Sequence, residues 1–220
     1  MKFTDVFTNF IHDWPLPTAP ISESFVVMGC SHTTGVGLDR EQAYPSLLSR
    51  HYKMPVYNLA VGNGNADTCR LNFFQLIESD LPKFLVIQWP NPVRKIIWTY
   101  KNNEAFGVLQ NITNGDVEFQ RMAAIMELQF YWDWVSEIVS IHATSRRIGL
   151  PVVHIYLDQL KEGLDVIFQE KNLVMHWDEK IPGKTWFFDN GAADSMHHSA
   201  WCHEQWVKRL IPLIDEVTTR

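Results

Sequence analysis

The sequence predicts an α/β protein in which one parallel sheet is covered by helices on both sides, giving three layers. Short apolar, β-branched runs alternate along the chain with longer segments whose apolar residues recur at helical spacing. This alternation is typical of the strand–helix–strand crossovers that build parallel sheets. With 220 residues and no internal repeat, low-complexity tract or Pro/Gly-rich linker, the chain is predicted to form a single domain, residues 1–220.

Four runs are predicted to be strands. They are residues 25–29 (FVVMG), 56–61 (VYNLAV), 84–89 (FLVIQW) and 152–157 (VVHIYL). Each is short and rich in Val, Ile, Leu or aromatic residues. Because these strands are expected to run parallel, their carboxyl ends meet at one edge of the sheet, where open α/β sheets bind their ligands.

Helices are predicted between and after these strands. Residues 40–52 and 67–79 have helical character, and residues 119–148 are predicted to form the longest helix. A last helix is expected to run from Ser199, a candidate N-cap, to about residue 217. Apolar residues at helical spacing are expected to face the core, namely Met122, Ile125, Met126, Phe130, Trp134, Ile138 and Ile141 in the long helix and Trp206, Leu210, Ile214 and Val217 in the last one.

The stretch at about 94–118 has no regular pattern and follows directly on a predicted strand end. It is rich in Asn and aromatic residues. We therefore predict an insertion or lid over the site. Three aromatic side chains at or after that strand end are expected to bind substrate: Trp89, Trp98 and Tyr100.

Charge and hydropathy exclude several classes of protein. The chain has 19 basic and 25 acidic residues, a net charge of −6, and no basic cluster, so no nucleic-acid partner is expected. Asp5, His12 and Asp13 interrupt the N-terminal stretch where a signal peptide needs an unbroken apolar run, and no membrane span is predicted. We expect a cytoplasmic protein, or a virion-associated one if the chain is of phage origin.

Cysteine usage agrees with a reducing compartment. The three cysteines form an odd set without a CxxC pair, so no disulfide framework is predicted: Cys30, Cys69 and Cys202.

Polar residues follow three of the predicted strands. After the first, Ser31 is a candidate hydroxyl nucleophile in a glycine-flanked turn, residues 29–37 (GCSHTTGVG). Gly62 after the second strand offers a backbone N–H, and Asn91 after the third offers a side-chain amide. Donors of this kind can stabilise an oxyanion.

A fourth polar segment lies near the C-terminus. Asp194 and His197 are three residues apart, a spacing that places both on the same side of a helical turn. The carboxylate can then fix the orientation of the imidazole. The spacing favours His197 over the adjacent His198 as a general base.

These four segments, in this order, resemble the sequence blocks of the SGNH (GDSL-type) hydrolase family. The family blocks are Gly-Asp-Ser, an Asn followed by Gly, Gly-x-Asn-Asp, and Asp-x-x-His. The similar residues here are, block by block, Gly29-Cys30-Ser31, Asn58 with Gly62, Asn91, and Asp194 with His197. The resemblance covers nearly the whole chain and implies a flavodoxin-like sheet, the SGNH hydrolase fold.

The resemblance also implies a mechanism. Ser31 would attack an ester carbonyl, His197 would take its proton, and Asp194 would hold His197 in the reactive tautomer. The oxyanion hole would consist of the Ser31 and Gly62 backbone N–H groups and the Asn91 side chain. The expected protein is a serine esterase or deacylase without metal or organic cofactor, acting on a small-molecule or glycan ester, with an O-acetyl group on a carbohydrate or a short acyl ester as substrate.

The chain departs from the family pattern at two blocks. Cys30 stands where the family has Asp; we expect a buried structural thiol, with a second nucleophile as the alternative. In the third block, Trp89 and Pro92 replace Gly and Asp beside Asn91. This divergence leaves a rival from another class, a catalytically silent glycan-binding or structural protein that keeps the fold.

Other ligand sites are disfavoured by spacing. A zinc site of His198, Cys202 and His203 is not predicted, because their positions point to different faces of a helix. The turn after the first strand lacks the lysine of a phosphate-binding loop. His32 and His51 are interpreted as polar surface or loop residues.

Overall fold

The structure is a computed structural model, and it describes residues 14–92, 94–101, 104–110, 117–156, 174–176 and 197–219. Five parallel strands form the main sheet in the order β2-β1-β3-β6-β7. Their bounds are β1 Phe25–Met28, β2 Val56–Asn58, β3 Leu85–Trp89, β6 Val152–Tyr156 and β7 Val174–His176. This order is flavodoxin-like, which confirms the predicted fold class. The sequence did not predict β7, which is three residues long.

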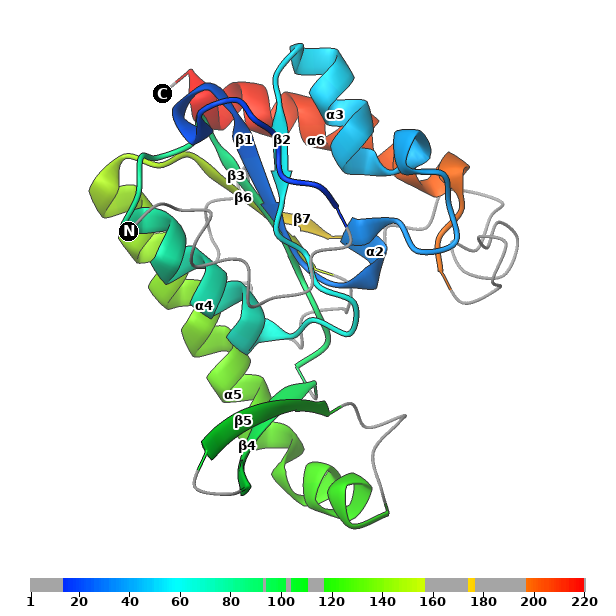
Figure 1. The fold of residues 1–220 in the computed structure, drawn as a ribbon, viewed down its shortest axis with the longest axis vertical. Coiled ribbons are helices and arrows are strands. Elements are labelled where there is room, and N and C mark those ends of the chain that lie inside the picture. Colours follow the sequence, from blue (N-terminus) through cyan, green and yellow to red (C-terminus); the bar gives the residue numbers. More distant parts are fainter. Residues whose placement is uncertain are drawn as a thin grey trace.

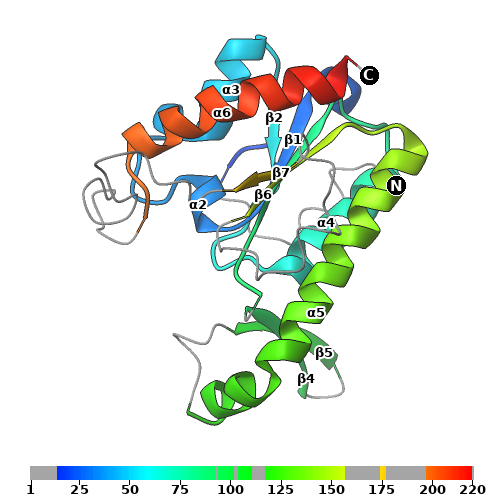
Figure 2. The same cartoon turned by 180° about the vertical axis from the view of Figure 1, so that it is seen from behind.

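Helices cover both faces of the sheet and make the three predicted layers (Figures 1 and 2). One face carries α4 (Ala66–Ile77) and α5 (Val117–Ile148), and the other carries α3 (Tyr44–Tyr52) and α6 (Ala200–Thr218). Shorter helical turns are η1 (Ile21–Glu23), α2 (Ser31–Thr34) and η2 (Arg40–Gln42).

The interior strand β1 shows how the sheet separates two cores. Val26 and Met28 point to the cluster that includes α4 and α5, whereas Phe25 and Val27 point to the cluster that includes α3 and α6. All four side chains are fully buried. Successive residues of a strand face opposite sides, so a strand covered on both faces must be apolar throughout.

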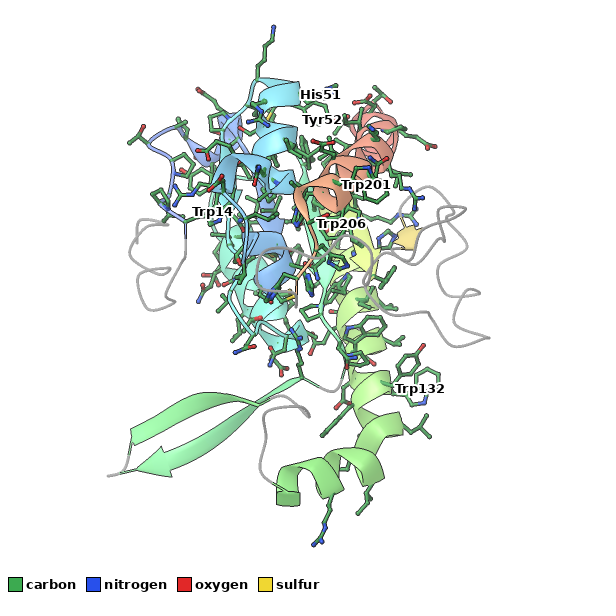
Figure 3. All side chains as sticks on the ribbon, turned by 90° about the vertical axis from the view of Figure 1, so that its right-hand side faces the viewer. Trp14, His51, Tyr52, Trp132, Trp201 and Trp206 are labelled. Carbon is green, nitrogen blue, oxygen red and sulfur yellow. The ribbon has the colours of Figure 1, made fainter. Side chains whose placement is uncertain are left out.

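The last helix agrees with its prediction. The Ser199 hydroxyl caps α6 by accepting a hydrogen bond from the backbone N–H of Cys202 at 3.4 Å. The four residues predicted to face the core are buried: Trp206, Leu210, Ile214 and Val217. Figure 3 shows Trp206 on the body of the molecule. None of the described helices is long and apolar enough to cross a membrane.

The long helix α5 packs on the sheet only along its later part. Trp134 and Ile138 are buried as predicted, with Phe130 and Ile141. The predictions for Ile125 and Met126 are wrong, since Ile125 is 84% exposed and Met126 is also exposed. The reason is visible in Figures 1 and 3, where the first turns of α5 extend beyond the end of the sheet and have no strand to cover. The side chain of Met122 lies outside the description.

An antiparallel hairpin projects from the same end of the molecule as the first turns of α5 (Figure 1). It consists of β4 (Lys95–Lys101) and β5 (Glu104–Gln110), and it stands apart from the main sheet (Figure 3). The hairpin falls within the stretch predicted as an insertion or lid, whose function as a lid stays a prediction.

Candidate active site

The candidate nucleophile lies at the point where the sheet changes direction. From β1 the chain passes first to β2 on one side and later to β3 on the other. The crevice between the diverging connections is where doubly wound sheets bind ligands. Ser31 is the first residue of α2, two residues beyond Gly29 at the end of β1, and its side chain is partly exposed.

The structure brings the C-terminal segment that carries His197 to the same edge of the sheet. His197 Nε2 lies 2.9 Å from Ser31 Oγ, although the two residues are 166 positions apart. When Nε2 carries no proton, the Ser31 hydroxyl donates to it, which is the arrangement that a general base requires. Figure 2 shows α2 close to the chain that leads into α6.

A second pair of histidines lies directly beside the first pair. His198 Nδ1 is 2.8 Å from His32 Nδ1, so one imidazole donates and the other accepts. Both rings are buried. The interpretation of His32 as a surface or loop residue is therefore wrong, because its side chain is only 8% exposed. His51 is exposed on α3, as predicted.

Burial keeps these histidines neutral. Desolvation, followed by the charge of His197, lowers the pKa of His198 to about 4. Desolvation, followed by the charge of His198, holds the pKa of His32 well below its ordinary value. The sequence carries one signal for this pair, since His32 follows Ser31 just as His198 follows His197.

The remaining histidine of this region is bound to the backbone. His203 Nδ1 accepts a hydrogen bond from the Tyr44 N–H at 2.9 Å, so its proton is on Nε2. Desolvation is the main cause that lowers the pKa of His203 to about 3. Within the described ranges, no three His, Cys, Asp or Glu residues are grouped so that they could hold a metal ion.

Two glycines let the loops after β1 and β2 approach closely. The Val61 N–H donates to the Gly29 carbonyl at 3.2 Å. A Cβ on Gly64 would lie 2.5 Å from the Gly29 oxygen, so only glycine fits this contact. A Cβ on Gly29 would meet the Thr33 hydroxyl. The loop that carries Gly62 is thus fixed against the turn that carries Ser31.

Side chains of the neighbouring strands β2 and β3 form hydrogen bonds with α2. The Thr33 hydroxyl donates to Gln88 Oε1 of β3 at 2.5 Å. The Asn58 amide donates to the Thr33 carbonyl at 3.2 Å and accepts from the Ala60 N–H at 3.1 Å. The Asn of the second family block therefore has a positioning contact with the nucleophile turn. Sequence reasoning assigned no role to Gln88.

Cys30 occupies the position next to the nucleophile and is fully buried. Its Sγ is 3.4 Å from Gln88 Nε2, which donates to it. The predicted burial of this thiol is confirmed.

Two residues of the third family block differ in burial: Trp89 lies in the core and Asn91 is partly exposed. Trp89 is fully buried, and its indole N–H donates to His154 Nδ1 at 2.9 Å. Its side chain therefore belongs to the core and does not line a substrate surface, contrary to the sequence interpretation. Asn91 is partly exposed at the carboxyl edge of β3, where its carbonyl accepts from the Arg94 N–H at 3.1 Å.

Three predicted site residues cannot be placed by side chain. Asp194 lies outside the described residues. Trp98 and Tyr100 lie in β4, but their side chains are likewise outside the description. Their roles stay predictions.

The comparisons with known proteins rest on structure. No family model matches the sequence, and no curated protein does. The esterase EstA from Pseudoalteromonas sp., solved in a form inhibited by monoethylphosphonate, matches with a TM-score of 0.55 at 12% identity over 90% of this chain and 100% of that one.

Two further solved structures are similar. A lipolytic protein of the G-D-S-L family from Desulfitobacterium hafniense has a TM-score of 0.55 at 12% identity, covering 87% of this chain and 99% of that one. The other is a carbohydrate esterase, with a TM-score of 0.51 at 15% identity over 92% of this chain and 68% of that one. Its active site has divergent catalytic and non-catalytic binding functions.

The order of the parallel strands and the helices on both faces of the sheet agree with these matches. The resemblance noted in the sequence is thus confirmed at the level of the fold. The chain has the fold of the SGNH (GDSL-type) hydrolases.

Proposed function

We propose that this protein is an SGNH-type serine hydrolase of carboxylic esters. The observation that carries the proposal is the 2.9 Å contact between Ser31 Oγ and His197 Nε2 at the carboxyl edge of the sheet. A hydroxyl is a weak nucleophile until a base within hydrogen-bond distance takes its proton. The esterase and lipolytic proteins that share the fold support the same reaction class.

The reaction follows from this pair. Ser31 Oγ bonds to the ester carbonyl carbon while His197 Nε2 accepts the hydroxyl proton. Collapse of the tetrahedral intermediate breaks the bond to the alcohol, which leaves with the proton from His197, and an acyl-Ser31 ester remains. Water, deprotonated by His197, then releases the acid and restores Ser31. Asp194 is proposed to accept a hydrogen bond from the His197 Nδ1–H and so to hold the imidazole in the tautomer that leaves Nε2 free.

An oxyanion hole is proposed from the Ser31 and Gly62 N–H groups and the Asn91 amide. The N–H of a first helical residue has no partner within its helix, so that of Ser31 points outward from α2. The contacts of Gly29 with Val61 and Gly64 support a fixed place for Gly62. Each donor would contribute about 3 kcal/mol of transition-state stabilisation.

For the substrate we propose a short acyl group, with an acetyl group on a carbohydrate as the preferred case. The similarity to a carbohydrate esterase supports this choice. Trp98 and Tyr100, in the hairpin that follows Asn91, are the proposed aromatic contacts for the substrate.

Short-chain p-nitrophenyl esters test the reaction. Wild-type protein is expected to hydrolyse p-nitrophenyl acetate, and Ser31→Ala and His197→Ala are each expected to lower kcat by a factor on the order of 10⁴ or more. Mass spectrometry should show that a reactive phosphonate labels the wild-type protein once, on the peptide that contains Ser31, and does not label Ser31→Ala.

The same experiment separates the rival function. Folded wild-type protein without hydrolysis or labelling, but with binding of glycans, would identify a silent binding protein. Hydrolysis that Ser31→Ala leaves unchanged would refute the serine mechanism.

A further inference from the structure

Arg94 emerges from the same turn as Asn91. Its backbone N–H donates to the Asn91 carbonyl at 3.1 Å, which closes a tight turn just after β3. Because β3 pairs with β1, this turn lies at the same edge of the sheet as Ser31. Neither the family blocks nor the proposed catalytic machinery uses Arg94.

The guanidinium of Arg94 is placed near the nucleophile turn. Its positive charge acts on His32, the residue after Ser31, and is the third-largest charge contribution that lowers the pKa of His32, after those of His198 and His197. Among the described groups that act on His32, Arg94 is the single permanently charged cation, since the others are histidines. A positive charge therefore lies near the nucleophile turn at neutral pH.

This guanidinium is incompletely satisfied. The side chain is partly exposed, but its Nη1 atom is buried and has no hydrogen-bond partner among the described residues. Among the residues that the structure describes, no carboxylate forms an ion pair with Arg94. A buried charged donor without a partner is unfavourable, so a site of this kind favours a ligand that supplies an acceptor.

We propose that Arg94 binds a carboxylate of the ester substrate, so that the protein prefers esters of acidic compounds. The planar guanidinium presents paired N–H donors that match the two oxygens of a carboxylate. One guanidinium balances one negative charge, whereas a phosphate monoester carries nearly two at neutral pH. The inference rests on the proposed function and narrows its substrate class.

Paired esters test the inference and locate the carboxylate. For the acyl side, mono-(4-nitrophenyl) succinate is compared with 4-nitrophenyl butyrate. For the alcohol side, 4-acetoxybenzoate is compared with phenyl acetate. Wild type is expected to have a higher kcat/KM for the anionic member of one pair, and that pair identifies the side that Arg94 contacts.

The variants Arg94→Gln and Arg94→Lys test whether the preference for the anionic ester depends on Arg94. Arg94→Gln is expected to lower the anionic-to-neutral ratio of kcat/KM by tenfold or more, and Arg94→Lys by less, because the ammonium keeps the charge but loses the paired donors. Arg147→Gln is the matched control. Arg147 is exposed in the last turn of α5, near the amino ends of the strands, and its loss should leave the ratio within twofold.

A ratio that Arg94→Gln leaves within twofold of wild type, or equal rates for both members of both pairs in wild type, would overturn the inference while the hydrolase function stands. Absence of any hydrolysis would refute the hydrolase function instead. In that case calorimetry with Ser31→Ala still decides the inference. Tighter binding of the anionic ester that depends on Arg94 would support it, and equal affinities would reject it.

Discussion

His198 Nδ1 lies 2.8 Å from His32 Nδ1, immediately beside the contact between His197 and Ser31. Two consecutive residues of the C-terminal segment therefore bind two consecutive residues of α2. The buried pair fixes the backbone from which His197 reaches Ser31. His198 also packs edge-on against Trp206 of α6, with ring centroids 4.8 Å apart.

We expect loss of the His32–His198 hydrogen bond to impair catalysis without removing a catalytic group. His32→Ala and His198→Ala should each lower kcat/KM for p-nitrophenyl acetate, and the double variant should lose little more than either single one. A double-mutant cycle of unfolding free energies should give a coupling of about 1–2 kcal/mol. His51→Ala, at an exposed site on α3, is the control. Fully additive losses would show that the pair is not coupled.

Cys30→Ala is expected to retain most of the activity. The thiol is fully buried and accepts a hydrogen bond from Gln88. In native wild type, the Cys30 thiol should resist an aromatic disulfide reagent and should react only after unfolding. Near-complete loss of turnover in a variant with an unchanged circular dichroism spectrum would contradict this assignment.

Asn91→Ala is expected to lower kcat on the order of 100-fold while KM changes little, because an oxyanion donor acts mainly in the transition state. Asn91→Asp is the matched variant, since it keeps the shape but replaces the donor with a carboxylate, and it should be at least as impaired. Unchanged kcat in both would remove Asn91 from the oxyanion hole.

Gly64→Ala is expected to disturb the site through packing. Its Cβ would lie 2.5 Å from the Gly29 carbonyl oxygen, so the loop that carries Gly62 would have to move away from the nucleophile turn. We expect a loss of about 1–3 kcal/mol in unfolding free energy together with a lower kcat. Gly149→Ala is the comparison: Gly149 has a positive φ of 70° but open space around it, after α5 and away from the site. It should lose stability and keep kcat.

Buried neutral histidines predict a loss of stability in mild acid. Desolvation lowers the pKa of His154 to about 3, that of His203 to about 3 and that of His198 to about 4, all below the ordinary value of 6.5. Below about pH 6.5 the unfolded chain binds protons that the folded chain does not. The contribution of these neutral histidines to the unfolding free energy is therefore fully present above pH 6.5. It decreases as the pH falls toward 4, by about 1.4 kcal/mol per pH unit for each histidine.

Urea unfolding at pH 7, 6 and 5 measures this slope. His154→Gln keeps an acceptor for the Trp89 N–H. It should reduce the number of protons taken up on unfolding, and with it the slope of the unfolding free energy against pH, by about one proton. His51→Gln should leave it unchanged, because His51 is exposed. An identical slope in wild type and His154→Gln would show that His154 is not buried as a neutral group.

The layers of the fold and the edge of the sheet that carries the site could be predicted from local sequence patterns. Apolar runs such as 84–89 can be buried only as strands covered on both faces, and helical spacing placed Trp206 and Leu210 toward the core. Local turn chemistry singled out Ser31, and the Asp-x-x-His spacing singled out His197. These are properties of a few adjacent residues, so they can be recognised without knowing the fold.

Which of these side chains contact one another depends on how distant segments pack. The position of His32 next to Ser31 does not show that its ring is buried, because this burial depends on His198, 166 positions away. Trp89 and Ile125 were misplaced for the same reason: a strand end or a helix stripe is buried only where another element covers it. Trp89 is covered by Trp134 and His154, whereas Ile125 lies where α5 has passed the end of the sheet. Burial depends on the packing of distant segments, which periodicity within one segment does not encode.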